Sequence, residues 1–97
     1  MYRDVYLQLE KDFYPYAKPS PPEDFLTPEW LFGQVQTMLK DILQEQSSAL
    51  GPLLYRIDIS EKKAREATSE GRLDADALAW AILRRTAQKV WLRRTLG

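Results

Sequence analysis

The chain has 97 residues, of which 14 are basic and 14 are acidic, so its formal net charge is zero. An apolar content of 44% is enough for a hydrophobic core, and the length fits a single domain. The balanced charge argues against a strongly basic nucleic-acid-binding protein. Since cysteine and histidine are both absent, the sequence excludes disulfides, Cys/His zinc sites and catalysis by either side chain.

The N-terminal sequence MYRDVYLQLEKDFY has acidic residues where a signal peptide would have a basic lead and an apolar stretch. No apolar run approaches the roughly 20 residues that span a bilayer. We therefore expect a soluble, cytoplasmic protein with no membrane partner.

Charge is unevenly distributed between the two halves of the chain. Residues 1–50 carry 4 basic and 8 acidic side chains, whereas residues 51–97 carry 10 and 6. The acidic half can fold against the basic half, or the two can pair between copies through a charge-assisted interface. Both interpretations stay open at this point.

Residues 1–26 are predicted to form an N-terminal helix followed by a proline-rich arm. The steps from Val5 and Tyr6 to Leu9 and Phe13 follow one face of a helix over residues 2–13. Four prolines then predict an irregular or polyproline-like arm over residues 14–25. Because this arm also contains aromatic residues, we expect it to lie on a surface.

Residues 27–97 are predicted to form a helical bundle. Thr27 and Pro28 are typical of a helix start, and the apolar residues that follow predict a long helix over residues 28–46. Gly33 within it suggests a close approach of another helix.

A break at Gly51 and Pro52 precedes a short helical segment that reaches Ile57. Either Asp58 or Ser60 can cap the next helix. That helix is expected to be lightly packed, to run to about residue 69 and to end at Gly71 in a left-handed cap.

Asp74 is a good cap for a last helix over residues 75–94. At 100° per residue, a core stripe runs along this helix. The fold class is therefore all-α: a small helical bundle with two long helices that pack antiparallel or at a moderate crossing angle. Two or three short helices and the arm complete it.

Trp80, Arg84 and Trp91 lie on the last helix, away from the centre of its core stripe. Their spacing permits both indoles to stack on the guanidinium. The arm or the N-terminal helix can cover this flank, or the flank can bind a partner or a second copy. Trp and Arg are the residues most enriched in binding hot spots.

Arg85, Lys89 and Arg93 form a second line, and residues 84–94 contain five basic residues and no acidic one. Such residues complement a helix dipole and cover apolar surface. They can also pair with the acids of residues 1–50, or bind phosphate or nucleic acid.

The stretch LLYRIDISE at residues 53–61, followed by a basic terminal helix with Gln88 and Lys89, resembles a group of short uncharacterised bacterial helical proteins. The resemblance covers about residues 50–94 and implies no activity. Tyr55 and Arg56 are its polar members. Arg56 is expected to pair with Asp58 or Glu61, and the alternative is a Tyr/Arg pair that faces a ligand.

The sequence offers no glycine-rich phosphate loop and no metal-ligand spacing, so we expect no enzyme, cofactor or metal. The main hypothesis is a non-enzymatic protein that binds a protein partner or a second copy of itself. The alternative is a nucleic-acid accessory protein that uses the basic C-terminal helix. The candidate interaction residues are Trp80, Arg84, Trp91, Arg85, Lys89, Arg93, Tyr55 and Arg56.

Overall fold

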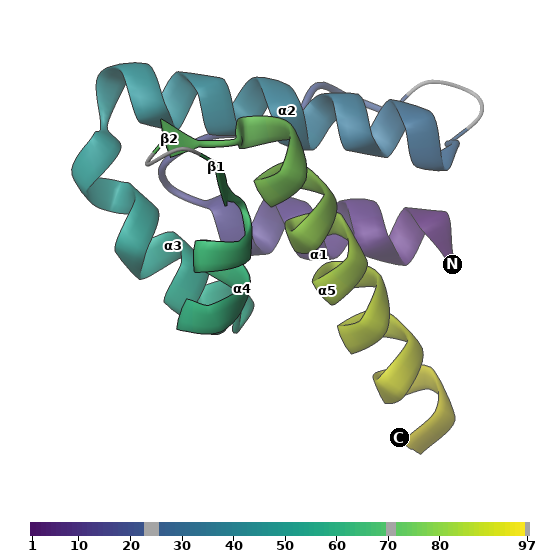
Figure 1. Ribbon diagram of the computed structural model, residues 1–97. Coiled ribbons are helices and arrows are strands. Elements are labelled where there is room, and N and C mark those ends of the chain that lie inside the picture. Colours follow the sequence, from purple (N-terminus) through teal and green to yellow (C-terminus); the bar gives the residue numbers. More distant parts are fainter. Residues whose placement is uncertain (23–25, 70–71, 97) are drawn as a thin grey trace.

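The computed structural model describes residues 1–22, 26–69 and 72–96. It is mostly helical, which confirms the predicted all-α class (Figure 1). The elements in chain order are α1 (Tyr2–Phe13), α2 (Pro28–Glu45), the 3-10 turn η1 (Ser47–Ala49), α3 (Leu50–Ile57), α4 (Glu61–Glu66), β1 (Thr68–Ser69), β2 (Arg72–Leu73) and α5 (Ala75–Leu96).

Helices α1 and α2 lie beside each other, and α5 crosses them obliquely (Figure 1). The C-terminal turns of α5 extend beyond the rest of the molecule. Each helix presents one apolar stripe to the shared core, so the packing follows the 3.6-residue period of the sequence. The fully buried large side chains are Leu9, Phe13, Leu31, Val35, Met38, Leu39, Ile42, Leu53, Ile57, Leu78, Ile82 and Val90.

The segment that joins α1 to α2 is held within the same chain. Its Ser20 carbonyl accepts a hydrogen bond from the Tyr6 hydroxyl at 3.1 Å, and its Ser20 N–H donates to Gln34 at 2.7 Å. Pro19 is buried. The described part of this segment therefore contacts both α1 and α2. Phe25, an aromatic residue of the predicted arm, lies outside the described residues.

Local sequence signals account for the start of α2 and α5. The Thr27 hydroxyl accepts from the Trp30 N–H at 3.1 Å, with Pro28 in the first turn. The Asp74 carboxylate accepts from the N–H groups of Asp76 and Ala77 at 3.0 and 3.1 Å. Both caps satisfy donors that a helix start leaves free.

Gly33 does not mark a close helix approach, because a Cβ built there has no heavy atom within 4 Å apart from its own helix and its chain neighbours. A close approach of another helix therefore does not explain this glycine, and among the described residues a Cβ at this position would meet open space.

Ser60 caps α4 by accepting from the Lys63 N–H at 3.2 Å. Asp58 instead ends α3 in the left-handed conformation, with φ 71° and ψ 44°. The prediction of a helix to residue 69 is wrong: α4 ends at Glu66, and β1 pairs antiparallel with β2. Threonine and serine are weak helix formers, so strand pairing prevails here. The predicted cap at Gly71 lies outside the described residues.

Candidate functional site

Helix α5 carries most of the predicted interaction residues, and the core side of the helix fixes their directions. Buried residues of α5, among them Leu78, Ile82 and Val90, face α1 and α2. The remaining faces are open to solvent or to the shorter elements. The predicted residues on this helix are Trp80, Arg84, Arg85, Lys89, Trp91 and Arg93.

A surface groove of about 550 Å³ runs between α5 and the segment 58–67, which contains α4. We call it the α4–α5 groove. It brings together Trp80, Arg84 and Arg85 from the predicted set. Its apolar lining residues are Ile59, Ala67, Ala77, Trp80 and Ala81. Its polar lining residues are Asp58, Ser60, Lys63, Glu66, Arg84, Arg85 and Gln88.

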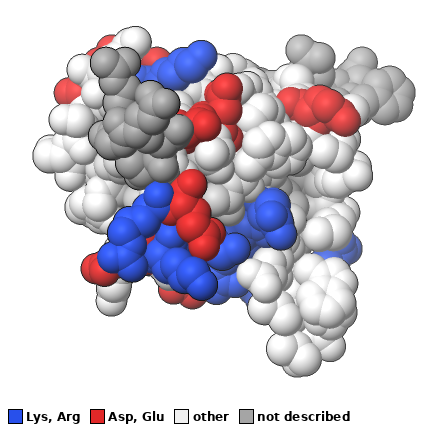
Figure 2. Space-filling model, in the orientation of Figure 1, with Lys and Arg blue, Asp and Glu red and all other residues white. Residues whose placement is uncertain are grey.

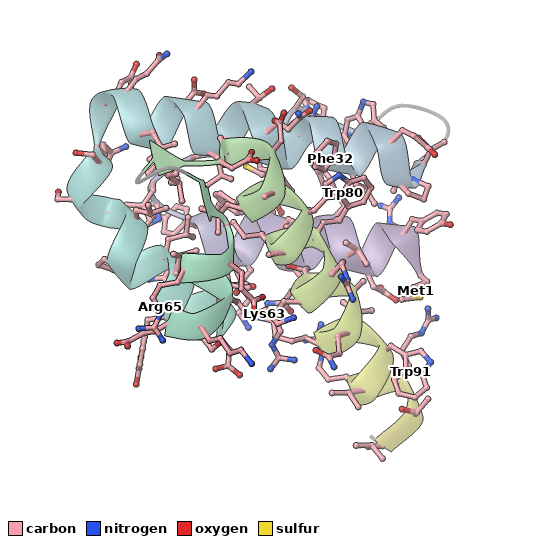
Figure 3. All side chains as sticks on the ribbon, viewed as in Figure 1. Met1, Phe32, Lys63, Arg65, Trp80 and Trp91 are labelled. Atoms are coloured by element: carbon pink, nitrogen blue, oxygen red, sulfur yellow. The ribbon has the colours of Figure 1, made fainter. Side chains whose placement is uncertain are left out.

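Trp80 lines this groove and packs against α2 (Figure 3). Its ring stacks on Phe32, with 4.3 Å between ring centroids and 20° between planes. The side chain is nevertheless 48% exposed. Stacking fixes the orientation of the indole, while about half of its surface stays available for contact.

Trp91 does not join Trp80 in one cluster. Eleven residues of α-helix separate the two indoles by about 16 Å along the axis. Trp91 lies on the extended end of α5 and is 53% exposed (Figure 3). The predicted stack of both indoles on Arg84 is not found among the described residues, where the one cation–π contact recorded is Arg56 over Tyr16, at 5.8 Å.

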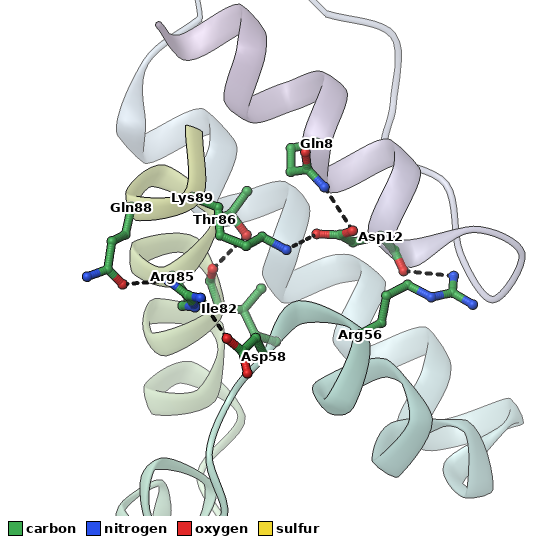
Figure 4. A network of polar contacts seen from close by, with 9 residues as sticks. All are labelled: Gln8, Asp12, Arg56, Asp58, Ile82, Arg85, Thr86, Gln88 and Lys89. Carbon is green, nitrogen blue, oxygen red and sulfur yellow. Dashed lines mark hydrogen bonds and ion pairs between the residues drawn. The ribbon is translucent and has the colours of Figure 1, made fainter. Parts of the chain in front are cut away.

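The basic line of α5 is largely paired with carboxylates. Arg85 contacts Asp58 at 2.7 Å, and Lys89 contacts Asp12 at 2.8 Å (Figure 4). Arg94 contacts a further acid, Asp4, at 3.3 Å. The Lys89 and Arg94 pairs join the acidic half of the chain to the basic half. This is the intrachain complementarity that the charge distribution allowed.

Asp12 is the centre of a buried polar network (Figure 4). Its side chain is 6% exposed and accepts from Gln8 at 2.9 Å as well as from Lys89. Because each buried polar group is paired, the network fixes α5 against α1 without leaving an unsatisfied charge. No buried side-chain nitrogen or oxygen of the described residues lacks a hydrogen-bond partner.

Arg56 does not pair with Asp58 or Glu61, so that prediction is wrong. Its guanidinium donates to the backbone carbonyls of Asp12 and Tyr14, at the end of α1. Five donors in a planar fork suit such multiple contacts. Tyr55 is 87% exposed, and a Tyr55/Arg56 pair that faces a ligand stays a prediction.

Among the predicted α5 residues and the residues that line the groove, three cations have no carboxylate partner in the described part of the chain: Lys63, Arg84 and Arg93. Lys63 and Arg84 line the α4–α5 groove, and Arg93 lies in a separate hollow beside α1. Basic side chains gather over the lower half of the face in Figure 2, interrupted by a few acidic ones. Two of these unpaired cations therefore lie together where α4 approaches α5.

The sequence interpretation missed Lys63, Phe32 and the floor of the groove. Ala77 and Ala81 are one turn apart on α5, a spacing that places two small side chains on one face. That signal is present in the sequence, but it points to a groove only once the opposing segment is known.

Burial raises the pKa of the Tyr6 hydroxyl above its usual value of 10.0, and the charge of Glu10 acts in the same direction. This tyrosine belongs to the core and to the arm contact, not to the groove. The described residues contain no group of three or more acidic side chains that could hold a metal ion. None of the helices seen in these residues combines the length and apolar character needed to cross a membrane.

Comparisons with protein-family models, with curated proteins and with solved structures found no match to this chain. The site must therefore be interpreted from its own geometry.

Proposed function

We propose that this protein is a non-enzymatic binding protein that acts through contact with another protein. The observation that carries the proposal is Trp80, an indole that stacks on Phe32 and is half exposed. It lines a groove with Arg84, for which the described residues show no ion pair. Exposed aromatic and arginine side chains with fixed orientation are typical of binding hot spots. The partner is a different protein or a second copy of this chain. A cytoplasmic location and the resemblance to bacterial helical proteins stay predictions.

The alternative is a nucleic-acid accessory protein that uses Arg84, Arg85, Lys89, Arg93 and Arg94. Three of these five side chains are in ion pairs with carboxylates. Contacts with successive phosphates require free cations along one face. The pairing therefore favours a protein partner over a nucleic acid.

The test is affinity capture from an extract of the cells that make the protein, with nuclease treatment of half of the sample. Light scattering coupled to size exclusion is run on the purified chain in parallel. We expect either a stoichiometric protein partner that survives nuclease or a defined oligomer. Capture that disappears with nuclease would support the alternative. A monomer that captures nothing would contradict both.

A further inference from the structure

We infer that the α4–α5 groove binds an acidic peptide segment of a partner protein, with an apolar side chain inserted against Trp80. The inference rests on the proposed function and names the chemistry of its partner. It follows from three properties of the groove: its size, its apolar floor and its unpaired positive charge.

The floor of the groove is low and apolar. Ala77 and Ala81 expose little more than methyl groups, while Ile59 and Trp80 provide larger apolar surface around them. The groove has a volume of about 550 Å³ and is open to solvent along one side, which suits an extended segment that lies along it. An aliphatic or aromatic side chain of a partner would be removed from water when it packs against this floor. The burial of apolar surface would contribute to the affinity.

The charges of the groove select an acidic partner. Lys63 and Arg84 have no ion-pair partner among the described residues, and Arg85 is held by Asp58, whose side chain is 76% exposed. Of the two acids that line the groove, Asp58 is paired with Arg85, and Glu66 has no ion pair among the described residues. Within the described part of the chain, the groove thus has two unpaired cations and one unpaired carboxylate. Two carboxylates of a peptide would therefore find free cations and form charge-assisted hydrogen bonds.

A second copy of this chain does not fit the same groove face to face. A two-fold interface places each patch against a copy of itself, so it would bring together two surfaces that each carry three cations and two carboxylates and share the same excess of positive charge. Like charges brought together in an interface oppose binding. A single-stranded nucleic acid is also disfavoured, because Phe32 already covers one face of the indole and a continuous row of phosphates would have to pass Asp58 and Glu66. A peptide can instead place a few carboxylates at Lys63 and Arg84 and neutral residues elsewhere.

The experiment uses a displayed library of short random peptides, selected on the full chain at low salt. We expect the selected peptides to combine at least two Asp or Glu residues with a Leu, Ile, Phe or Trp residue. A synthetic selected peptide is then titrated against variants by fluorescence anisotropy. K63E and R84E should each weaken binding by roughly three- to tenfold, since each reverses an exposed charge that attracts the peptide.

The matched controls are R93E and W91A, which lie on the same helix but outside the groove. Both should bind the peptide as the wild type does, whereas W80A should bind it more weakly. Because W80A also removes the stack on Phe32, its folding is checked by circular dichroism. The charge variants test the inference independently of that stack.

Peptides without acidic enrichment, or equal weakening by R93E and R84E, would overturn the inference. So would failure to select any peptide, displacement of the peptide by an oligothymidylate, or a dimer that W80A dissociates. If R84E still captures the cellular partner as the wild type does, the groove is not the site at which the partner binds, and the proposed function stands. If the wild type binds acidic peptides yet captures no protein, the proposed function fails alone.

Discussion

Replacement of Lys89 by methionine tests whether the network around Asp12 holds α5 against α1. The Lys89→Met change keeps the apolar stem and leaves the Asp12 carboxylate, 6% exposed, with Gln8 as its remaining side-chain donor. Breaking a fully buried ion pair costs about 3–5 kcal/mol. Since the Lys89 side chain is 20% exposed and water reaches it, we expect a loss of about 2–3 kcal/mol in the free energy of unfolding.

A matched control lies one turn away on the same helix. Arg85 is in an ion pair of similar length with Asp58, but the Asp58 side chain is 76% exposed. Arg85→Met should therefore cost less than about 1 kcal/mol. The two variants differ mainly in how well water screens the remaining carboxylate, so the difference between them measures burial.

The assay is urea unfolding followed by tryptophan fluorescence and circular dichroism. A loss of this size lowers the urea midpoint by about 1–2 M for a small domain. Asp12→Asn combined with Lys89→Met should recover most of it, because the amide removes the charge and still accepts from Gln8. Equal losses in Lys89→Met and Arg85→Met, or no recovery in the double variant, would refute the reasoning.

Three further predictions concern single positions outside the groove. Gly33→Ala should raise the free energy of unfolding by up to about 1 kcal/mol, because a Cβ meets open space there; a lower melting temperature would contradict this. Asp74→Ala should lower the free energy of unfolding by about 1 kcal/mol, because α5 loses its cap. Asp74→Asn should keep most of the wild-type stability in urea unfolding, because asparagine can also cap a helix. Wild-type stability should fall as pH rises above 10. The pKa of the Tyr6 hydroxyl is raised in the folded state, so above pH 10 the unfolded chain loses this proton more readily than the folded one. Tyr6→Phe should flatten this alkaline slope in unfolding measured across pH, and the exposed Tyr2→Phe should leave it unchanged.

Features that depend on neighbouring residues could be predicted from the sequence. A cap requires a side-chain oxygen that reaches a backbone N–H two or three residues later, so Thr27 and Asp74 could be assigned from the sequence. The apolar period likewise locates the buried faces of the helices, since it reflects the 3.6-residue turn. The error at residues 67–69 arose because β1 is specified mainly by its pairing with β2, which the weak helix propensity of Thr68 and Ser69 only permits.

Features that depend on distant residues could not be predicted. Arg56 had acidic neighbours in the sequence, yet its partners are carbonyls 42 and 44 residues earlier, which come within reach only when α3 packs on α1. The stacking partner of Trp80 was missed for the same reason, since Phe32 belongs to α2. Periodicity shows which face of a helix is apolar, but it does not show which helix covers that face.

The charge difference between the halves of the chain explains why the groove is basic. The acidic half neutralises part of the basic half through Asp12 and Asp4, which contact Lys89 and Arg94 along α1. Both contacts lie on the side of α5 that faces α1. The α4–α5 groove lies against the segment 58–67, where Asp58 pairs with Arg85 and Arg84 has no carboxylate partner among the described residues. Lys63 and Arg84 therefore stay without a carboxylate among the described residues of the groove that Trp80 lines, and an acidic partner would supply the missing negative charge there.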